Sequence, residues 1–211
     1  MTDQQRLHIE ATADRQFATN SYLVEDEATH DAVVIDANLE PELMVGLAER
    51  RTANVRAILL THTDIDHIAG LNRLRKAFGD VPIAVHDSER EVVTEGRPLR
   101  REFPNALPTF DNVDALVPGE TYRAGSLEFE VLHTPGHSPG GVTLRIGNAL
   151  FTGDALFAGS IGRSDFSNSD GVALIEGIRQ QLMVHPDDRL VFSGHGPVST
   201  IGQERRYNPF L

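Results

Sequence analysis

The sequence contains no cysteine among its 211 residues. This absence excludes disulfide bridges, thiolate zinc sites and cysteine nucleophiles together. Any bound metal must therefore be held by histidine and carboxylate side chains. Both are available, because the chain has nine histidines and 31 acidic residues.

Positive charge and long apolar runs are also scarce. The chain has 19 basic residues, a net charge of −12 and a pI near 5.1, which disfavours a nucleic-acid partner or an anionic membrane surface. No apolar run follows Met1, and none reaches the roughly 18 residues of a membrane span. We expect a cytoplasmic protein with a small-molecule substrate and without nucleic-acid or membrane partners. The oligomeric state stays open, with a homodimer as one option.

Short apolar segments and amphipathic segments alternate along the chain, and the length suits a single domain over residues 1–211. Residues 90–116 contain three prolines and predict an irregular loop at the mouth of a pocket. The pattern predicts helices at 41–51, 68–78, 171–183 and 199–206, and strands at 20–25, 32–36, 55–60, 81–85, 127–132, 142–146, 149–152 and 190–192. Helices between short strands predict a layered α/β sandwich.

The densest group of candidate ligands directly follows the apolar segment 55–60. Within six residues it contains His62, Asp64, Asp66 and His67. Two imidazoles and two carboxylates this close together are electrostatically costly unless a cation neutralises them. The segment therefore predicts one half of a metal site.

Three further candidates follow apolar segments in a similar way. His137 lies in a turn rich in glycine and proline, Asp154 comes directly after Gly153, and His195 comes directly after Gly194. Glycine beside a ligand lets the backbone approach closely and adopt conformations that other residues resist. Four strand ends that deliver ligands to one edge predict a metal cleft at the rim of a sheet.

With these motifs the chain resembles the metallo-β-lactamase-fold hydrolases, and within them the short glyoxalase II-like (hydroxyacylglutathione hydrolase-like) branch. The resemblance covers nearly the whole length. The segment 162–165 and the tail 208–211 point to that branch, whereas the segments 61–67, 134–140, 152–154 and 193–197 point to the superfamily. The resemblance implies an α+β fold, a four-layer αββα sandwich with the cleft along one edge of its two sheets.

The resemblance also implies one or two divalent metal ions, with zinc as the first expectation and iron or manganese as alternatives. A metal-activated hydroxide, oriented by Asp66 as the catalytic residue, would attack the carbonyl carbon of a thioester or related acyl substrate. The implied ligands are His62 and His137 at the first metal, Asp66, His67 and His195 at the second, and Asp154 between them.

Asp64 departs from the family pattern, which has histidine at this position. Its carboxylate reaches less far than an imidazole and adds a negative charge. Oxygen ligands also favour iron or manganese over zinc. We expect a firm second metal position and a weaker first one. A metal ligand, a supporting carboxylate and a helix cap all remain open for Asp64.

Other readings are kept beside thioester hydrolysis. The persulfide dioxygenases of this superfamily use one iron held by two histidines and one aspartate, which resemble His62, His137 and Asp154. A lactonase of the same fold is a further alternative, as is a binding protein that has lost efficient chemistry. Arg163 and Asp165 are interpreted as an internal ion pair that braces the metal loop, with substrate contact as the alternative. The long-form glyoxalase II enzymes add a helical domain that holds glutathione, and we expect none here.

Overall fold

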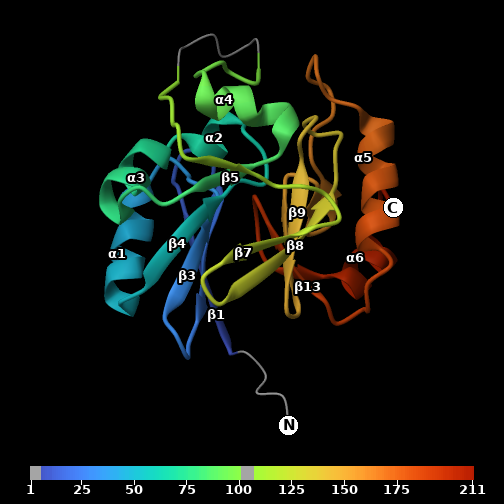
Figure 1. The fold of residues 1–211 in the computed structure, drawn as a ribbon. Helices are drawn as coiled ribbons and strands as arrows, with labels where there is room; N and C mark the ends of the chain where they lie inside the picture. The colour runs from blue at the N-terminus through green and yellow to red at the C-terminus, as the bar shows by residue number, and fades with distance from the viewer. Residues whose placement is uncertain (1–5, 101–106) are drawn as a thin grey trace.

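Two six-stranded sheets pack face to face in the computed structural model, which describes residues 6–100 and 107–211 (Figure 1). The first sheet has the order β1 (Leu7–Ala13), β2 (Asn20–Asp26), β3 (Asp31–Ile35), β4 (Asn54–Leu59), β5 (Ile83–Val85) and β6 (Val113–Ala115). The second has the order β14 (Ser199–Thr200), β13 (Leu190–Ser193), β10 (Ala149–Gly153), β9 (Val142–Ile146), β8 (Leu127–His133) and β7 (Thr121–Ala124).

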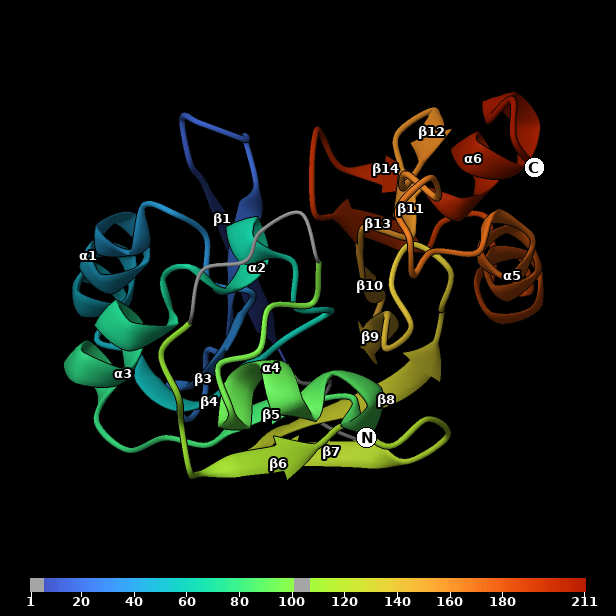
Figure 2. The ribbon, with the colours of Figure 1, turned by 90° about the horizontal axis from the view of Figure 1, so that it is seen from above.

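Helices cover the outer face of each sheet (Figure 2). The first sheet carries α1 (Pro41–Arg51) and α3 (Leu71–Phe78), and the second carries α5 (Gly171–Gly177), its π-helical continuation at Ile178–Leu182, and α6 (Ile201–Tyr207). At the upper edge in Figure 1 lie α2 (Ile65–Ile68) and α4 (Arg90–Thr94). The smaller elements are a 3₁₀ turn at Asp87–Glu89 and the hairpin of β11 (Leu156–Phe157) and β12 (Ser160–Ile161). The expected four-layer αββα sandwich is confirmed.

Strand alternation explains why three apolar layers form. Successive side chains of a strand point to opposite faces of its sheet. In β3, Val34 packs under the first pair of helices, whereas Val33 and Ile35 pack between the two sheets. In β10, Leu150 packs under α5 and Phe151 packs between the sheets. Strands that are apolar on both faces can therefore occupy the middle of four layers.

The predicted helix at 68–78 is wrong in one respect, because the structure breaks it at Gly70. There α2 ends and α3 begins, and the Gly70 N–H donates to the carbonyl oxygen of Ala37 at 2.9 Å. A Cβ atom at Gly70 would lie 2.5 Å from the carbonyl oxygen of Asn38. Close packing against the loop after β3 separates the two helices, and helical periodicity does not reveal that contact.

The prediction of an irregular segment at 90–116 is also partly wrong. The structure forms α4 at its start and β6 near its end, while residues 101–106 lie outside the described residues. The strands β1 and β7 were not predicted, because exposed and half-buried residues are mixed along them and give no clear alternation. Within residues 6–100 and 107–211, no helix is long and apolar enough to cross a membrane.

Candidate metal centre

The seven predicted ligands come together at one edge of the sandwich. His62 and Asp64 follow β4, and Asp66 and His67 lie in α2. The other three are His137 in the turn between β8 and β9, Asp154 directly after β10, and His195 directly after β13. Because β10 and β13 are parallel neighbours, their carboxyl ends place Asp154 and His195 side by side.

Three of the histidines are oriented by a hydrogen bond at Nδ1. In each case the partner can only accept, so Nδ1 carries the proton and Nε2 is left for another partner. The acceptors are the Asp36 carboxylate for His67 at 2.9 Å, the Arg163 carbonyl for His137 at 2.8 Å, and the Phe17 carbonyl for His195 at 3.2 Å. This arrangement turns the three Nε2 atoms toward the carboxylates of the centre.

Three polar atoms at the middle of the centre are buried and have no hydrogen-bond partner among the described residues. They are Nε2 of His62, Nε2 of His67 and Oδ1 of Asp154. Buried polar groups are normally paired, since desolvation without a partner costs free energy. A cation at the second metal position would satisfy two of these atoms, Nε2 of His67 and Oδ1 of Asp154.

The pKa values of two carboxylates show how strongly charged the centre is. Burial works to raise the pKa of Asp154, but the charge of His67 and the hydrogen bond from His195 hold it well below its usual value. Burial also works to raise the pKa of Asp66, but the hydrogen bond from His195 and the charge of His67 lower this pKa to about 2. Both carboxylates are therefore anionic at neutral pH and available to a metal ion.

The donor set of the second metal position fits a divalent ion. Ligand atoms of Asp66, His67 and His195 lie within 4.8 Å of one another, and His67 Nε2 is 3.3 Å from Asp154 Oδ1. Two imidazoles and two carboxylates suit zinc, iron or manganese. The hydroxyl of Thr19 donates to Asp66 at 2.7 Å and fixes this carboxylate. A second hydrogen-bonded layer of this kind is typical of metal centres.

The first metal position differs, because Asp64 is paired with a cation of the protein itself. Arg100 is 2% exposed and donates from Nε and Nη2 to the two oxygens of Asp64, at 2.6 and 2.8 Å. His137 Nε2 is 3.0 Å from Oδ2 of the same carboxylate. Ligand atoms of His62, Asp64 and His137 do lie within 4.8 Å of one another. The carboxylate among them is already neutralised by Arg100. The donors of the first metal position therefore fit a divalent ion less well than those of the second position do.

The helix-cap interpretation of Asp64 is wrong. Asp64 occupies the position before α2, but its side chain makes no capping hydrogen bond within the described part of the chain. Its oxygens face Arg100 and His137 instead. The electrostatic demand of Arg100 outweighs the weaker attraction of a short helix.

A buried glutamate joins the two loops that carry the first group. Glu89 is 1% exposed and accepts from the backbone N–H and hydroxyl of Thr63, both at 2.7 Å. Its other oxygen accepts from the Gly140 N–H at 2.8 Å. Thr63 lies between two ligand candidates and Gly140 follows His137, so Glu89 fixes the distance between the two loops.

A pocket of about 480 Å³ opens over the centre. Five of the candidate ligands line it: Asp64, Asp66, His137, Asp154 and His195. Its other walls are mostly apolar and are formed by Phe17, Ile65, Phe157, Ile161 and Phe166, with Ser160 and Arg163. The volume and the mixture of apolar walls with few polar groups suit a small organic molecule.

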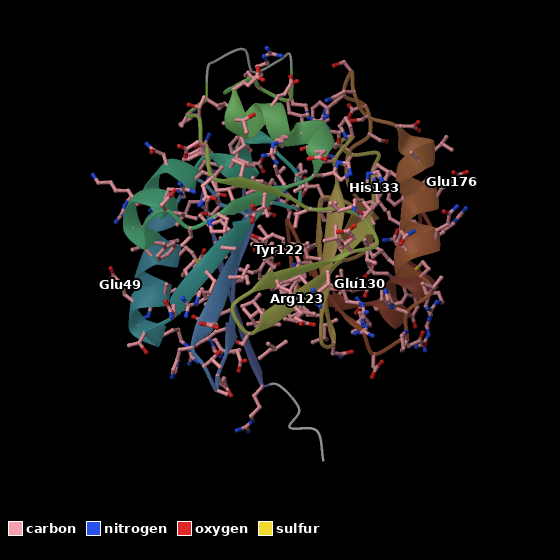
Figure 3. The ribbon with its side chains drawn as sticks, viewed as in Figure 1. Glu49, Tyr122, Arg123, Glu130, His133 and Glu176 are labelled. Carbon is pink, nitrogen blue, oxygen red and sulfur yellow. The ribbon has the colours of Figure 1, made fainter. Side chains whose placement is uncertain are left out.

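Arg163 and Asp165 form the predicted ion pair, with Nε 3.0 Å from Oδ1. The pair is exposed, so the prediction of an internal pair is wrong. The backbone of Arg163 nevertheless supports the centre through its bond to His137. His133 lies at the end of β8 (Figure 3). Its ring stacks on that of His86 with centroids 4.7 Å apart, and it belongs to none of the candidate ligand groups within the described residues.

Sequence reasoning missed Arg100, Asp36, Glu89 and Thr19. The sequence carries one signal for Arg100, since the extra negative charge of Asp64 calls for a cation nearby. It does not say which of the 19 basic residues supplies that cation, because the path of the segment around Arg100 cannot be derived from periodicity.

Comparison with known proteins agrees with this geometry. The chain is 36% identical to hydroxyacylglutathione hydrolase GloC of Haemophilus influenzae, over 97% of this chain and 98% of that protein. Two solved structures are similar: the BLEG-1 B3 metallo-beta-lactamase (TM-score 0.87, 33% identity, covering 97% of this chain and 99% of that one) and TTHA1623 in a di-iron-bound form (TM-score 0.82, 35% identity, covering 96% and 100%). The family model described as metallo-beta-lactamase superfamily matches residues 14–195. The chain therefore belongs to the metallo-beta-lactamase superfamily.

Proposed function

We propose that the protein is a metal-dependent hydrolase of small acyl thioesters. The observation that carries this proposal is the convergence of unpartnered, buried ligand atoms beside a pocket with apolar walls that Asp154 lines. The similarity to a hydroxyacylglutathione hydrolase along the whole chain supports thioesters as the substrate class. Zinc is the proposed ion, and the di-iron form of a similar structure keeps iron as an alternative.

The residues of this chain divide the work. Asp66, His67, His195 and Asp154 would hold the ion, which supplies Lewis acidity and activates water at neutral pH. Asp66 is anionic, is fixed by Thr19 and borders the pocket, so it can accept a proton from the attacking water. Phe17 and Phe157 line the pocket, where they can pack against an acyl chain and exclude bulk water.

The mononuclear iron dioxygenase is less well supported by the same geometry. It requires His62, His137 and Asp154 to hold one ion. His137 Nε2 instead faces Asp64, and Arg100 Nη2 lies only 3.3 Å from the same nitrogen. Production of sulfite from a persulfide, with consumption of oxygen by the iron-loaded protein, would favour this alternative over hydrolysis.

A substrate panel tests the proposal. Protein loaded with zinc, and separately with iron, is assayed under anaerobic conditions against a hydroxyacylglutathione, a short acyl thioester without glutathione, a lactone and a β-lactam. Hydrolysis of the thioesters at rates well above those of the lactone and β-lactam is the expected result. Efficient cleavage of the lactone or β-lactam with inert thioesters would overturn the substrate class.

The variant Asp66→Ala tests the role of the proposed proton acceptor. We expect thioester hydrolysis to fall by about 10²–10⁴-fold, the usual contribution of a positioned general base. Metal content should fall less, because three ligands of the position remain. Asp87→Ala, an exposed aspartate outside the centre, is the matched control and should keep both properties. Equal loss of metal and activity would reduce Asp66 to a ligand only.

A further inference from the structure

Arg100 is buried at the metal centre, and the function proposed above does not use it. Its guanidinium has five N–H groups, and each has an acceptor. Two go to Asp64, one goes to the carbonyl oxygen of His137 at 3.0 Å, and two go to the side-chain oxygens of Asn168 and Ser169, at 2.5 and 3.3 Å. A guanidinium with every donor used is a fixed part of the site and not a mobile arm for substrate.

We propose that Arg100 replaces the first metal ion of the superfamily, so that the centre holds a single divalent ion at Asp66, His67, His195 and Asp154. Arg100 is in this sense a positioning residue, because it acts through Asp64 and His137. The inference rests on the metal centre of the proposed function but not on the choice of thioester as substrate.

Charge supports this replacement. A family histidine at position 64 would be a neutral ligand, whereas Asp64 brings one negative charge into a site that already contains two further carboxylates. The bidentate pair with Arg100 cancels that charge. Paired charges of this kind are stable when buried only if their remaining donors and acceptors are satisfied. Arg100 meets that condition, and Asp64 Oδ2 also has His137 as a partner.

Competition for ligand atoms points the same way. Nη2 of Arg100 lies 3.3 Å from Nε2 of His137, the atom that would bind the first ion. An ion on that nitrogen would share its surroundings with a positive guanidinium, and two cations repel strongly in a buried site. The partners of the second position are different. They are Thr19 for Asp66, Asp36 for His67 and the Phe17 carbonyl for His195.

Packing holds Arg100 in this place. Its Cζ lies 4.3 Å from the centroid of Phe166, whose ring also contacts His137 edge-on at 5.9 Å. A cation over an aromatic face is attracted by the ring. The same ring receives Arg163 at 4.4 Å and lines the pocket. Arg100 therefore packs against Phe166, a residue of the pocket wall.

Ion counting tests the inference. Wild-type protein is stripped with a chelator, titrated with zinc and with manganese, and analysed by native mass spectrometry and calorimetry. We expect one tightly bound ion per chain. Two ions whose dissociation constants agree within tenfold would overturn the inference, because Asp64 would then serve the guanidinium and a metal ion together.

Variants sharpen the test. The double change Asp64→His with Arg100→Met removes the ion pair and restores the family histidine, and a second ion should then bind at least tenfold more tightly than any second ion of the wild type. Arg97→Met is the control, because Arg97 is exposed and pairs with Glu91 and Glu95 away from the centre. It should still bind one ion. If the double variant folds and binds only one ion, the inference fails.

Failure here is distinguishable from failure of the proposed function. A count of two ions in the wild type would leave thioester hydrolysis untouched. Conversely, a protein that binds one ion but hydrolyses no thioester would leave the role of Arg100 intact. The wild-type count also needs no variant, so it is informative even where Arg100→Met does not fold.

Discussion

The two imidazoles of the second metal position, those of His67 and His195, both have a raised pKa. Burial lowers the pKa of His195, but hydrogen bonds to Asp154 and Asp66 outweigh it and raise the pKa to about 10. Burial also lowers the pKa of His67, but the negative charges of Asp154 and Asp36 outweigh burial and raise this pKa well above its usual value. Protons therefore compete with a metal ion for the nitrogen atoms of these two imidazoles.

This protonation predicts a pH-dependent affinity. Because His195 is protonated below about pH 10 in the metal-free protein, an incoming ion must displace that proton. We expect the dissociation constant to fall as pH rises from about 6 to about 9, by up to tenfold per pH unit for each proton displaced. Chelator competition at several pH values measures it. An affinity that is independent of pH over this range would contradict the assignment of His195 as a ligand.

Glu89 provides a second prediction for a single side chain. In Glu89→Gln an amide NH₂ must face the N–H donors of Thr63 or Gly140. We expect a loss of about 1–3 kcal/mol in the free energy of unfolding, the cost of unsatisfied buried donors. Urea denaturation measures the loss. Glu91→Gln is the matched control, since Glu91 is exposed on α4, and its cost should stay below about 0.5 kcal/mol. Equal effects of the two changes would argue against the joining role of Glu89.

The individual candidate metal ligands could be predicted from the sequence, whereas the residues that form hydrogen bonds or ion pairs with them could not. His62, Asp66 and His67 are local in sequence, and their spacing reflects the turn after one strand. Arg100 reaches Asp64 across 36 residues. No local pattern encodes such a contact, since it depends on the path of the segment after α4. Whether Asp64 binds metal stays a prediction that the ion count decides.

At the scale of elements, the ends of β4, β10 and β13 determine where the ligands lie. Buried strands were predictable because both of their faces are apolar, as in β3 and β10. The edge strand β1 was not, because exposed and half-buried residues are mixed along it. Gly70 shows a third case, in which contact with another loop ends a helix whose periodicity would continue. Tertiary packing decides where such a helix ends, whereas sequence periodicity indicates only which face of the helix is apolar.

The turn after β13 leads to a prediction at this scale. A Cβ atom at Gly194 would lie 2.3 Å from Asp154 Oδ1 and 2.7 Å from His67 Cε1. In Gly194→Ala the strand end must therefore move away from two ligands, and we expect metal affinity to fall by about 10–100-fold. Gly46→Ala in α1 is the control, because its Cβ would meet Arg50 only at 3.5 Å. Unchanged affinity in Gly194→Ala would show that the turn does not position the ligands.

At the scale of the whole molecule, the centre depends on both halves of the sandwich. Asp66 and His67 come with the first sheet, and Asp154 and His195 come with the second. The bridge between Thr19 and His195 and the bond from Asn20 N–H to the Gly194 carbonyl at 2.7 Å join the two sheets near the centre. The layer order was predictable from the resemblance and from doubly apolar strands. The single domain over 1–211, the cytoplasmic location and the oligomeric state stay predictions.

One measurement tests most directly whether residues from both sheets bind the same metal ion. Crystals of protein loaded with zinc or manganese are measured at the absorption edge of the metal, and an anomalous difference map is calculated. The predicted result is a peak about 2.0–2.2 Å from ligand atoms of Asp66, His67, Asp154 and His195. If the metal in fully loaded protein is bound elsewhere and no peak lies at these four residues, the proposed metal centre is contradicted. The proposed hydrolase activity, which depends on this centre, is then contradicted as well.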